Sequence, residues 1–198
     1  MIGPSEAHLV RAIGAQRLSV RVGRPSVAPS ALGCSPTRRT RATSFPRHVE
    51  LPYNDWMSNP SDQDLKTLLT NAATIAIVGA SSNPERSSYG IMQRLQQAGY
   101  RVIPINPREA EILGEKAYAS LSDVQEPIDI VDVFRRAEDT PPIADEAVKV
   151  GAKALWLQSG IASDDAKARA TAGGLTVVMD ACIATIHSLL RVPGKRRA

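Results

Sequence analysis

The chain has 198 residues, 43% of them hydrophobic and 22% charged, a balance that excludes wholesale disorder and fibrous architecture and favours one ordinary domain with a tail. Its two cysteines, Cys34 and Cys182, form no zinc-binding spacing and no disulfide framework, and no apolar run approaches the roughly 18 residues that a membrane-spanning helix needs. The net charge of +4 arises in residues 1–56, with eight arginines against three acids, whereas residues 57–198 carry 16 basic and 17 acidic residues, which disfavours nucleic acid as a partner.

Residues 1–56 are expected to form a disordered extension. They contain six of the 14 prolines and no acidic residue between Ala7 and Val49. Such an Arg-rich and Ser-rich start is typical of an organelle transit peptide, but Met57 would itself be a sensible first residue, so we favour a misassigned start. The protein is then expected to be cytoplasmic, or organellar if the extension is a genuine transit peptide, with its one folded domain at 57–198.

Strands and helices alternate regularly along that domain. A short helix is predicted after Ser61 or Asp62, and Gly99, Gly151 and Gly173 are placed to end later helices. Pro104 favours an edge position or an early end for its strand. The apolar runs predict strands at 74–79, 101–105, 128–133, 154–157 and 175–179, separated by helices at about 89–98, 140–150, 163–172 and 182–190. The fold class is therefore α/β, a doubly wound, Rossmann-like parallel sheet of five strands in a single domain.

In such a fold, ligands bind beyond the carboxyl ends of the strands. The loop after the first strand offers glycine for close backbone approach, hydroxyl groups, and the free amides of a following helix, a combination that suits a phosphate. An alternative is that Ser87 or Ser88 is simply the N-cap of that helix. The loop is neither a GxGxxG fingerprint nor a P-loop. Its candidate binding residues are Gly79, Ala80, Ser81, Arg86, Ser87, Ser88 and Tyr89.

Arginines follow three different strands of the predicted sheet. The second strand ends in Asn106, Pro107 and Arg108, and the third in Phe134, Arg135 and Arg136. Arg108, Arg135 and Arg136 are expected to lie with Arg86 on one rim of the ligand crevice. Lys149 and Lys153 belong to the opposite rim. A cluster of guanidinium groups predicts a polyanionic nucleotide as the ligand.

Catalytic residues are scarce in this sequence, and we assign none. His187 is expected to be packed or solvent-facing, and Cys182 to be a small buried residue. Asp180 is interpreted as a cap of the last helix, with a contact to the ligand as the alternative. Asp129 and Asp132 are interpreted as structural residues with no obvious partner. No metal site is expected.

Five segments at the strand ends match a known family in order. They read Ile77-Val-Gly-Ala-Ser-Ser-Asn-Pro84, Pro104-Ile-Asn-Pro-Arg108, Asp129-Ile-Val-Asp-Val-Phe-Arg135, Leu155-Trp-Leu-Gln-Ser-Gly160 and Val178-Met-Asp180. Over about residues 62–190 the chain resembles the small single-domain coenzyme A (CoA)-binding proteins, which are similar to the CoA-binding domain of succinyl-CoA synthetase alpha subunits. The resemblance implies that CoA or an acyl-CoA lies with its phosphates on the loop from Gly79 and its remainder along Asn106–Arg108 and Phe134–Arg135.

Two departures from the family pattern affect the expected function. The phosphorylated histidine of the synthetases lies in a further domain, so a complete ligase is not expected. The family's Met-Asp-Arg-Cys motif is Met179-Asp-Ala-Cys182 here, and its Glu-His pair is Ile186-His187. The resemblance therefore favours a non-catalytic carrier, sensor or regulatory module, with a partner protein or a homo-oligomer left open. Two alternatives are an NAD(P)- or CoA-dependent oxidoreductase or acyltransferase, and a redox-sensing transcription regulator.

Overall fold

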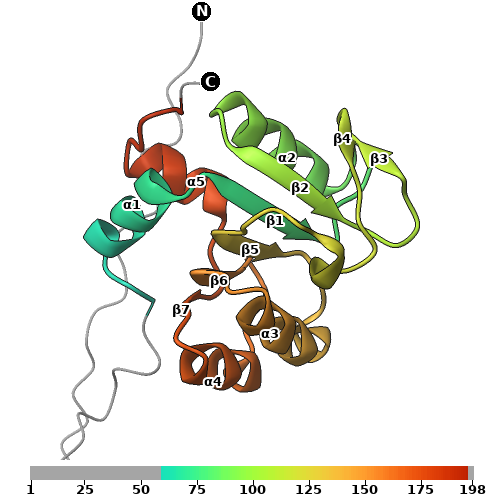
Figure 1. Ribbon diagram of the computed structural model, residues 1–198. Coiled ribbons are helices and arrows are strands. Elements are labelled where there is room, and N and C mark those ends of the chain that lie inside the picture. The colour runs from blue at the N-terminus through green and yellow to red at the C-terminus, as the bar shows by residue number, and fades with distance from the viewer. Residues whose placement is uncertain (1–58, 196–198) are drawn as a thin grey trace, which may run out of the picture. The chain divides into compact units, whose positions relative to one another are not determined.

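Five strands form one parallel sheet in the order β2-β1-β5-β6-β7 (Figure 1). The computed structural model describes residues 59–195, so the prediction for residues 1–56 lies outside the described range. The sheet strands are β1 (Thr74–Val78), β2 (Arg101–Ile105), β5 (Ile130–Val133), β6 (Ala154–Leu157) and β7 (Thr176–Val178). The helices are α1 (Asp62–Asn71), α2 (Ser87–Gln97), α3 (Thr140–Lys149), α4 (Asp164–Ala172) and α5 (Ile183–Leu189), with 3₁₀ turns at Leu121–Asp123 and Ala137–Asp139. The predicted fold class is confirmed, although β5 begins two residues late because its pairing with β1 and β6 starts at Ile130.

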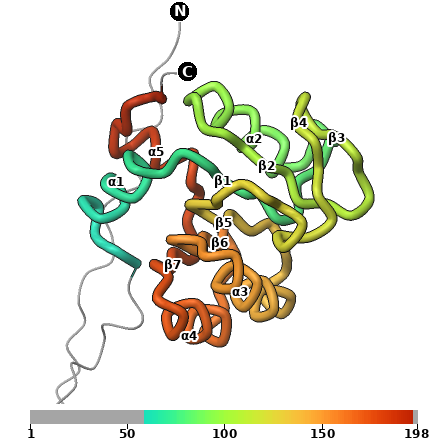
Figure 2. The backbone as a smooth tube through the Cα atoms, in the orientation of Figure 1, coloured from blue at the N-terminus to red at the C-terminus, as the bar shows by residue number. Residues whose placement is uncertain are grey.

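The order of the strands explains where a ligand can enter. The chain passes from β1 to β2 on one side and then to β5 on the other side of β1, as the backbone path in Figure 2 shows. Loops leaving neighbouring strands therefore turn to opposite faces of the sheet and leave a crevice between them.

Helices cover both faces of the sheet, so the strands are apolar on both sides. Leu69 of α1, Met92 of α2 and Ile183 of α5 pack with Ile77 and Trp156 on one face. Alanines of α3 and α4 fill the other face with Val131 and Leu155, and their small side chains let these two helices approach closely. The predicted two-faced burial of the strands is confirmed.

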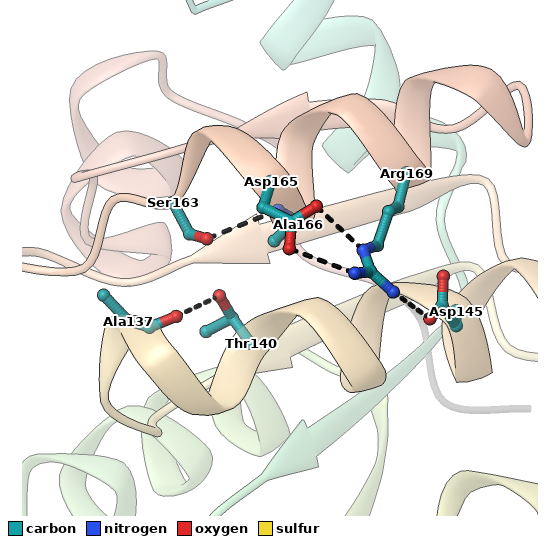
Figure 3. A network of polar contacts seen from close by, with 7 residues as sticks. All are labelled: Ala137, Thr140, Asp145, Ser163, Asp165, Ala166 and Arg169. Atoms are coloured by element: carbon teal, nitrogen blue, oxygen red, sulfur yellow. Dashed lines mark hydrogen bonds and ion pairs between the residues drawn. The ribbon is translucent and has the colours of Figure 1, made fainter.

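Polar contacts join α3 to α4 on the outer surface (Figure 3). The guanidinium of Arg169 bonds Asp165 on its own helix at 2.9 Å and Asp145 of α3 at 2.7 Å. Ser163 caps α4 by accepting from the amide of Ala166, and Thr140 donates to the carbonyl of Ala137. The charged groups of this network are exposed, so their ion pairs contribute little to the stability of the fold, whereas Thr140 is buried.

The end of the sheet opposite the crevice is tied together by Asp129. Its carboxylate accepts from the amides of Ala73 (2.7 Å) and Thr74 (3.0 Å) and pairs with Lys153 at 2.6 Å. Partial burial works to raise the pKa of Asp129, but the hydrogen bonds from Lys153 and the two amides outweigh it and lower this pKa. The expectation that Asp129 has no obvious partner was wrong, because its partners are 24 and about 55 residues away along the chain.

The outer edge of β2 is covered. Pro104 lies in this edge strand, as predicted, and its carbonyl faces outward to accept from the amide of Tyr118 at 3.0 Å. The nitrogen of Pro104, which carries no hydrogen, faces the same outer side. The proline therefore removes no hydrogen bond between β2 and β1. Close by, β3 (Glu111–Ile112) and β4 (Glu115–Lys116) form a small antiparallel hairpin that was not predicted.

Candidate functional site

A cavity of about 1140 Å³ lies beyond the carboxyl ends of β1, β2, β5 and β6. Every candidate binding residue except Tyr89 lines it, and Tyr89 lies on α2 between the lining residues Ser88 and Ile91. The cavity brings together four loops that are far apart in the sequence. Its lining comprises Gly79, Ala80, Ser81, Arg86, Ser87, Ser88, Ile91, Asn106, Pro107, Arg108, Glu109, Phe134, Arg135, Arg136, Gln158, Ser159, Gly160, Ile161 and Cys182.

The loop after β1 is held close to the loop after β5. Gly79 has a φ of +88°, and a Cβ atom built on it would lie 2.7 Å from the carbonyl oxygen of Phe134. Two turns around Asn83 shape the rest of the loop. The side-chain oxygen of Asn83 accepts from the backbone amide of Glu85, and the backbone amide of Asn83 donates to the hydroxyl of Ser81. Glycine at position 79 therefore lets these two cavity-lining loops approach each other closely.

Helix α2 begins at the cavity without a side-chain cap. Its N-cap is Arg86, in extended conformation, and no side chain of the described residues accepts from the first-turn amides. The alternative that Ser87 or Ser88 is the N-cap is wrong, because both lie within the helix and Ser88 is turned inward and buried. Uncapped amides and the positive end of the helix dipole together favour an anion.

Sequence reasoning missed an acidic group at the rim. The Glu109 carboxylate accepts from the amide of Ser82 (3.0 Å) and from the side-chain amide of Asn106 (3.1 Å). Asn106 also donates to the carbonyl of Ala80 and accepts from the amide of Arg108. This network fixes the loop after β2 against the loop after β1. No local sequence motif around Glu109 predicts these contacts, because they depend on β1 and β2 being neighbouring strands.

The four predicted arginines do meet at the cavity, from three separate loops. Arg136 pairs with Glu138 and Asp139, both at 3.3 Å. None of the ion pairs found within residues 59–195 involves Arg86, Arg108 or Arg135. Three exposed guanidinium groups therefore remain to neutralise a ligand.

The other end of the cavity is formed by the loop after β6 and the start of α5. Asp180 accepts from the amide of Gly160 at 2.6 Å, and its own amide donates to Ile161. The interpretation of Asp180 as the cap of α5 was wrong, because its carboxylate is taken by the neighbouring loop and Cys182 occupies the N-cap position. The expectation that Cys182 is buried was wrong, because it is half-buried and lines the cavity.

Beneath this end lies a buried carboxyl group. Asp132 accepts at Oδ1 from Nε2 of Gln158 at 2.8 Å, so its partner is a cavity residue that the sequence did not suggest. Burial raises the pKa of Asp132 to about 8, against the lowering effect of the hydrogen bonds from Gln158 and the Val133 amide.

His187 lies away from the cavity lining and packs its ring against Tyr100, with ring centroids 5.7 Å apart. Burial and the charge of Lys195 lower its pKa. Among residues 59–195 there is no cluster of His, Cys, Asp and Glu suited to a metal, and no helix long and apolar enough to span a bilayer.

A doubly wound sheet whose switch-point crevice gathers arginines and an uncapped helix start defines a Rossmann-like nucleotide-binding domain. Comparison with known families makes this more specific. The model of the CoA binding domain matches residues 73–188, and the chain belongs to that family.

The relatives include small proteins and larger ligases. YneT of Bacillus subtilis is 41% identical over 135 residues, covering 68% of this chain and all of YneT. The structure of a hypothetical protein from Pyrococcus horikoshii superposes with a TM-score of 0.65 at 36% identity, covering 67% of this chain and 93% of that one. An ADP-forming acetate–CoA ligase of Methanocaldococcus jannaschii is 34% identical over 92 residues, which are 46% of this chain and only 13% of the ligase.

Proposed function

We propose that the protein binds CoA or an acyl-CoA in this cavity and acts as a non-catalytic carrier, sensor or regulatory module. The observation that carries the proposal is the convergence of Arg86, Arg108 and Arg135 on one cavity of a CoA-binding-domain fold. CoA carries a pyrophosphate and a separate 3′-phosphate, and a phosphomonoester is nearly doubly charged at pH 7. Three unpaired guanidinium groups match such a distributed charge.

The residues present fit the parts of CoA. Gly79 lets the loops after β1 and β5 approach closely at the lining, and the start of α2 offers amides to a pyrophosphate. Phe134 is half-buried in the lining and offers an apolar face for the adenine ring. The lining contributed by residues 158–161 and Cys182 carries no charge, which suits the uncharged pantetheine arm.

The first test is thermal unfolding of the full chain with CoA, acetyl-CoA, NAD or NADP, followed by calorimetric titration. A ligand that binds only the folded state stabilises it, by about 2.7 kcal/mol at a concentration of 100 Kd. We expect CoA or acetyl-CoA to raise the melting temperature and NAD to leave it unchanged. A shift with NAD or NADP alone would reject the proposal in favour of an oxidoreductase.

The arginine contacts give a second prediction. Arg86→Ala and Arg108→Ala are each expected to weaken CoA binding by about 1–3 kcal/mol, or roughly 5- to 150-fold, because each removes a charge-assisted contact. Titration calorimetry at fixed salt measures the change. The control is Arg94→Ala, which removes an exposed arginine from α2 outside the cavity lining and should leave affinity unchanged. Wild-type affinity in both rim variants would contradict the assignment.

A further inference from the structure

The central strand β5 carries a fully buried carboxyl group where an apolar residue would be expected. In the register of the sheet Asp132 lies between Ile77 of β1 and Trp156 of β6. Both neighbours belong to the apolar core on the face covered by α1, α2 and α5. The Asp132 side chain is 0% exposed, and its Oδ2 has no hydrogen-bond partner among residues 59–195. A half-satisfied buried carboxyl group destabilises a fold, so packing alone does not account for Asp132.

The satisfied oxygen of Asp132 has one side-chain partner, and that partner lines the cavity. Gln158 follows β6, is 4% exposed, and donates from Nε2 to Oδ1 of Asp132. A glutamine amide has two nearly equivalent orientations unless a neighbour selects one. Asp132 selects the orientation of the Gln158 amide in which Nε2 points into the core. The amide oxygen of Gln158 then remains to contact a ligand.

The position of Gln158 indicates which part of a ligand it meets. The arginines that line the cavity follow β1, β2 and β5, whereas Gln158 belongs to the loop after β6, whose cavity-lining residues are uncharged. A carbonyl oxygen repels a phosphate and accepts from an N–H group. The matching ligand group is therefore a secondary amide N–H on an uncharged arm that extends from a polyanionic nucleotide.

We propose that Gln158 binds an amide N–H of the uncharged arm of the ligand, and that Asp132 is the positioning residue that fixes the Gln158 amide for this contact. The inference rests on the proposed function, because it presumes that the nucleotide end of CoA lies at the arginines. The inference assigns recognition of the uncharged arm of the ligand to the end of the cavity opposite the arginines.

Two probes separate the arm from the nucleotide in a calorimetric test with the full chain. CoA contains the arm, and adenosine 3′,5′-bisphosphate lacks it. Gln158→Met, which keeps the length of the side chain, is expected to weaken CoA binding about 3- to 10-fold, as for loss of one neutral hydrogen bond, and to leave the bisphosphate unaffected. Gln93→Met, an exposed substitution on α2, is the matched control.

Variants of Asp132 test the positioning role. Asp132→Leu should weaken CoA binding to the same extent as Gln158→Met, and Asp132→Asn should restore it because its amide oxygen still accepts from Gln158. The double variant Asp132→Leu with Gln158→Met should bind CoA no more weakly than Gln158→Met alone. A residue that only supported the fold would show neither the rescue nor this non-additivity.

The outcomes distinguish this inference from the proposed function. Wild-type CoA affinity in Gln158→Met, or an equal loss of both probes, overturns the arm contact while CoA binding stands. Full CoA affinity in a folded Asp132→Leu variant overturns the positioning role, and should that variant not fold, full CoA affinity in Asp132→Ala, which also removes the acceptor of Gln158, does so. A wild-type chain that binds neither probe overturns the proposed function and this inference with it.

Discussion

Gly79→Ala is expected to be the most damaging single substitution at the cavity, lowering the free energy of unfolding by about 2–5 kcal/mol and abolishing CoA binding. At a φ of +88° an alanine is strained by about 1–2 kcal/mol. Its Cβ would also lie 2.7 Å from the Phe134 carbonyl oxygen, a backbone atom that cannot rotate away. Separation of the two loops would widen the crevice in which we propose that the ligand binds. Urea unfolding and calorimetric titration measure both effects.

A substitution at a second glycine, Gly151, measures the backbone strain separately from the steric contact with Phe134. Gly151 has a φ of +73°, but no heavy atom of the described region lies within 4 Å of the Cβ position. Gly151→Ala should therefore cost only the strain, about 1–2 kcal/mol, and leave ligand affinity intact because it lies outside the cavity lining. Equal destabilisation by the two substitutions would show that the contact with Phe134 relaxes freely.

Stability is expected to fall as pH rises from about 4 to about 8, owing to Asp132. Its pKa is raised to about 8 in the folded state by burial, against an ordinary value of 3.8. Between these values the folded protein retains a proton that the unfolded chain has lost, so raising the pH favours unfolding. The contribution is at most about 1.4 kcal/mol per pH unit. Chemical denaturation at several pH values measures the slope.

His187 acts in the opposite sense, so a comparison of variants is needed. Its lowered pKa means that the unfolded chain binds a proton more readily below about pH 6.5, and stability falls there as pH decreases. The difference between wild type and Asp132→Asn removes this shared effect, since asparagine stays neutral. We expect the variant to gain stability relative to wild type as pH rises toward 8. Parallel pH profiles would mean that Asp132 does not change its protonation in this range.

The main sheet could be predicted from the sequence because each strand is a short apolar run bounded by a turn or helix signal. Gly99 and Gly151, which end their helices at positive φ, are local signals of this kind. The β3–β4 hairpin escaped prediction because its strands have two residues each and its turn is Leu113-Gly114, in which leucine takes the positive φ usually given to Asn or Asp.

The site could be predicted as far as it depends on strand ends alone. Arginines placed just after three strands had to meet at one edge of a parallel sheet, and they do. The contacts of Glu109 with Ser82 and of Asp132 with Gln158 join residues 26 or 27 positions apart. Each requires knowledge of which strands are neighbours and which face a side chain occupies, and neither follows from composition or spacing.

The cavity loops are fastened to one another before any ligand arrives. Asn106 holds the carbonyl of Ala80, and Asp180 holds the amide of Gly160. These bonds mean that much of the conformational entropy of the loops has already been lost on folding. Because an incoming ligand then orders little additional chain, a larger fraction of its contact free energy is retained as affinity.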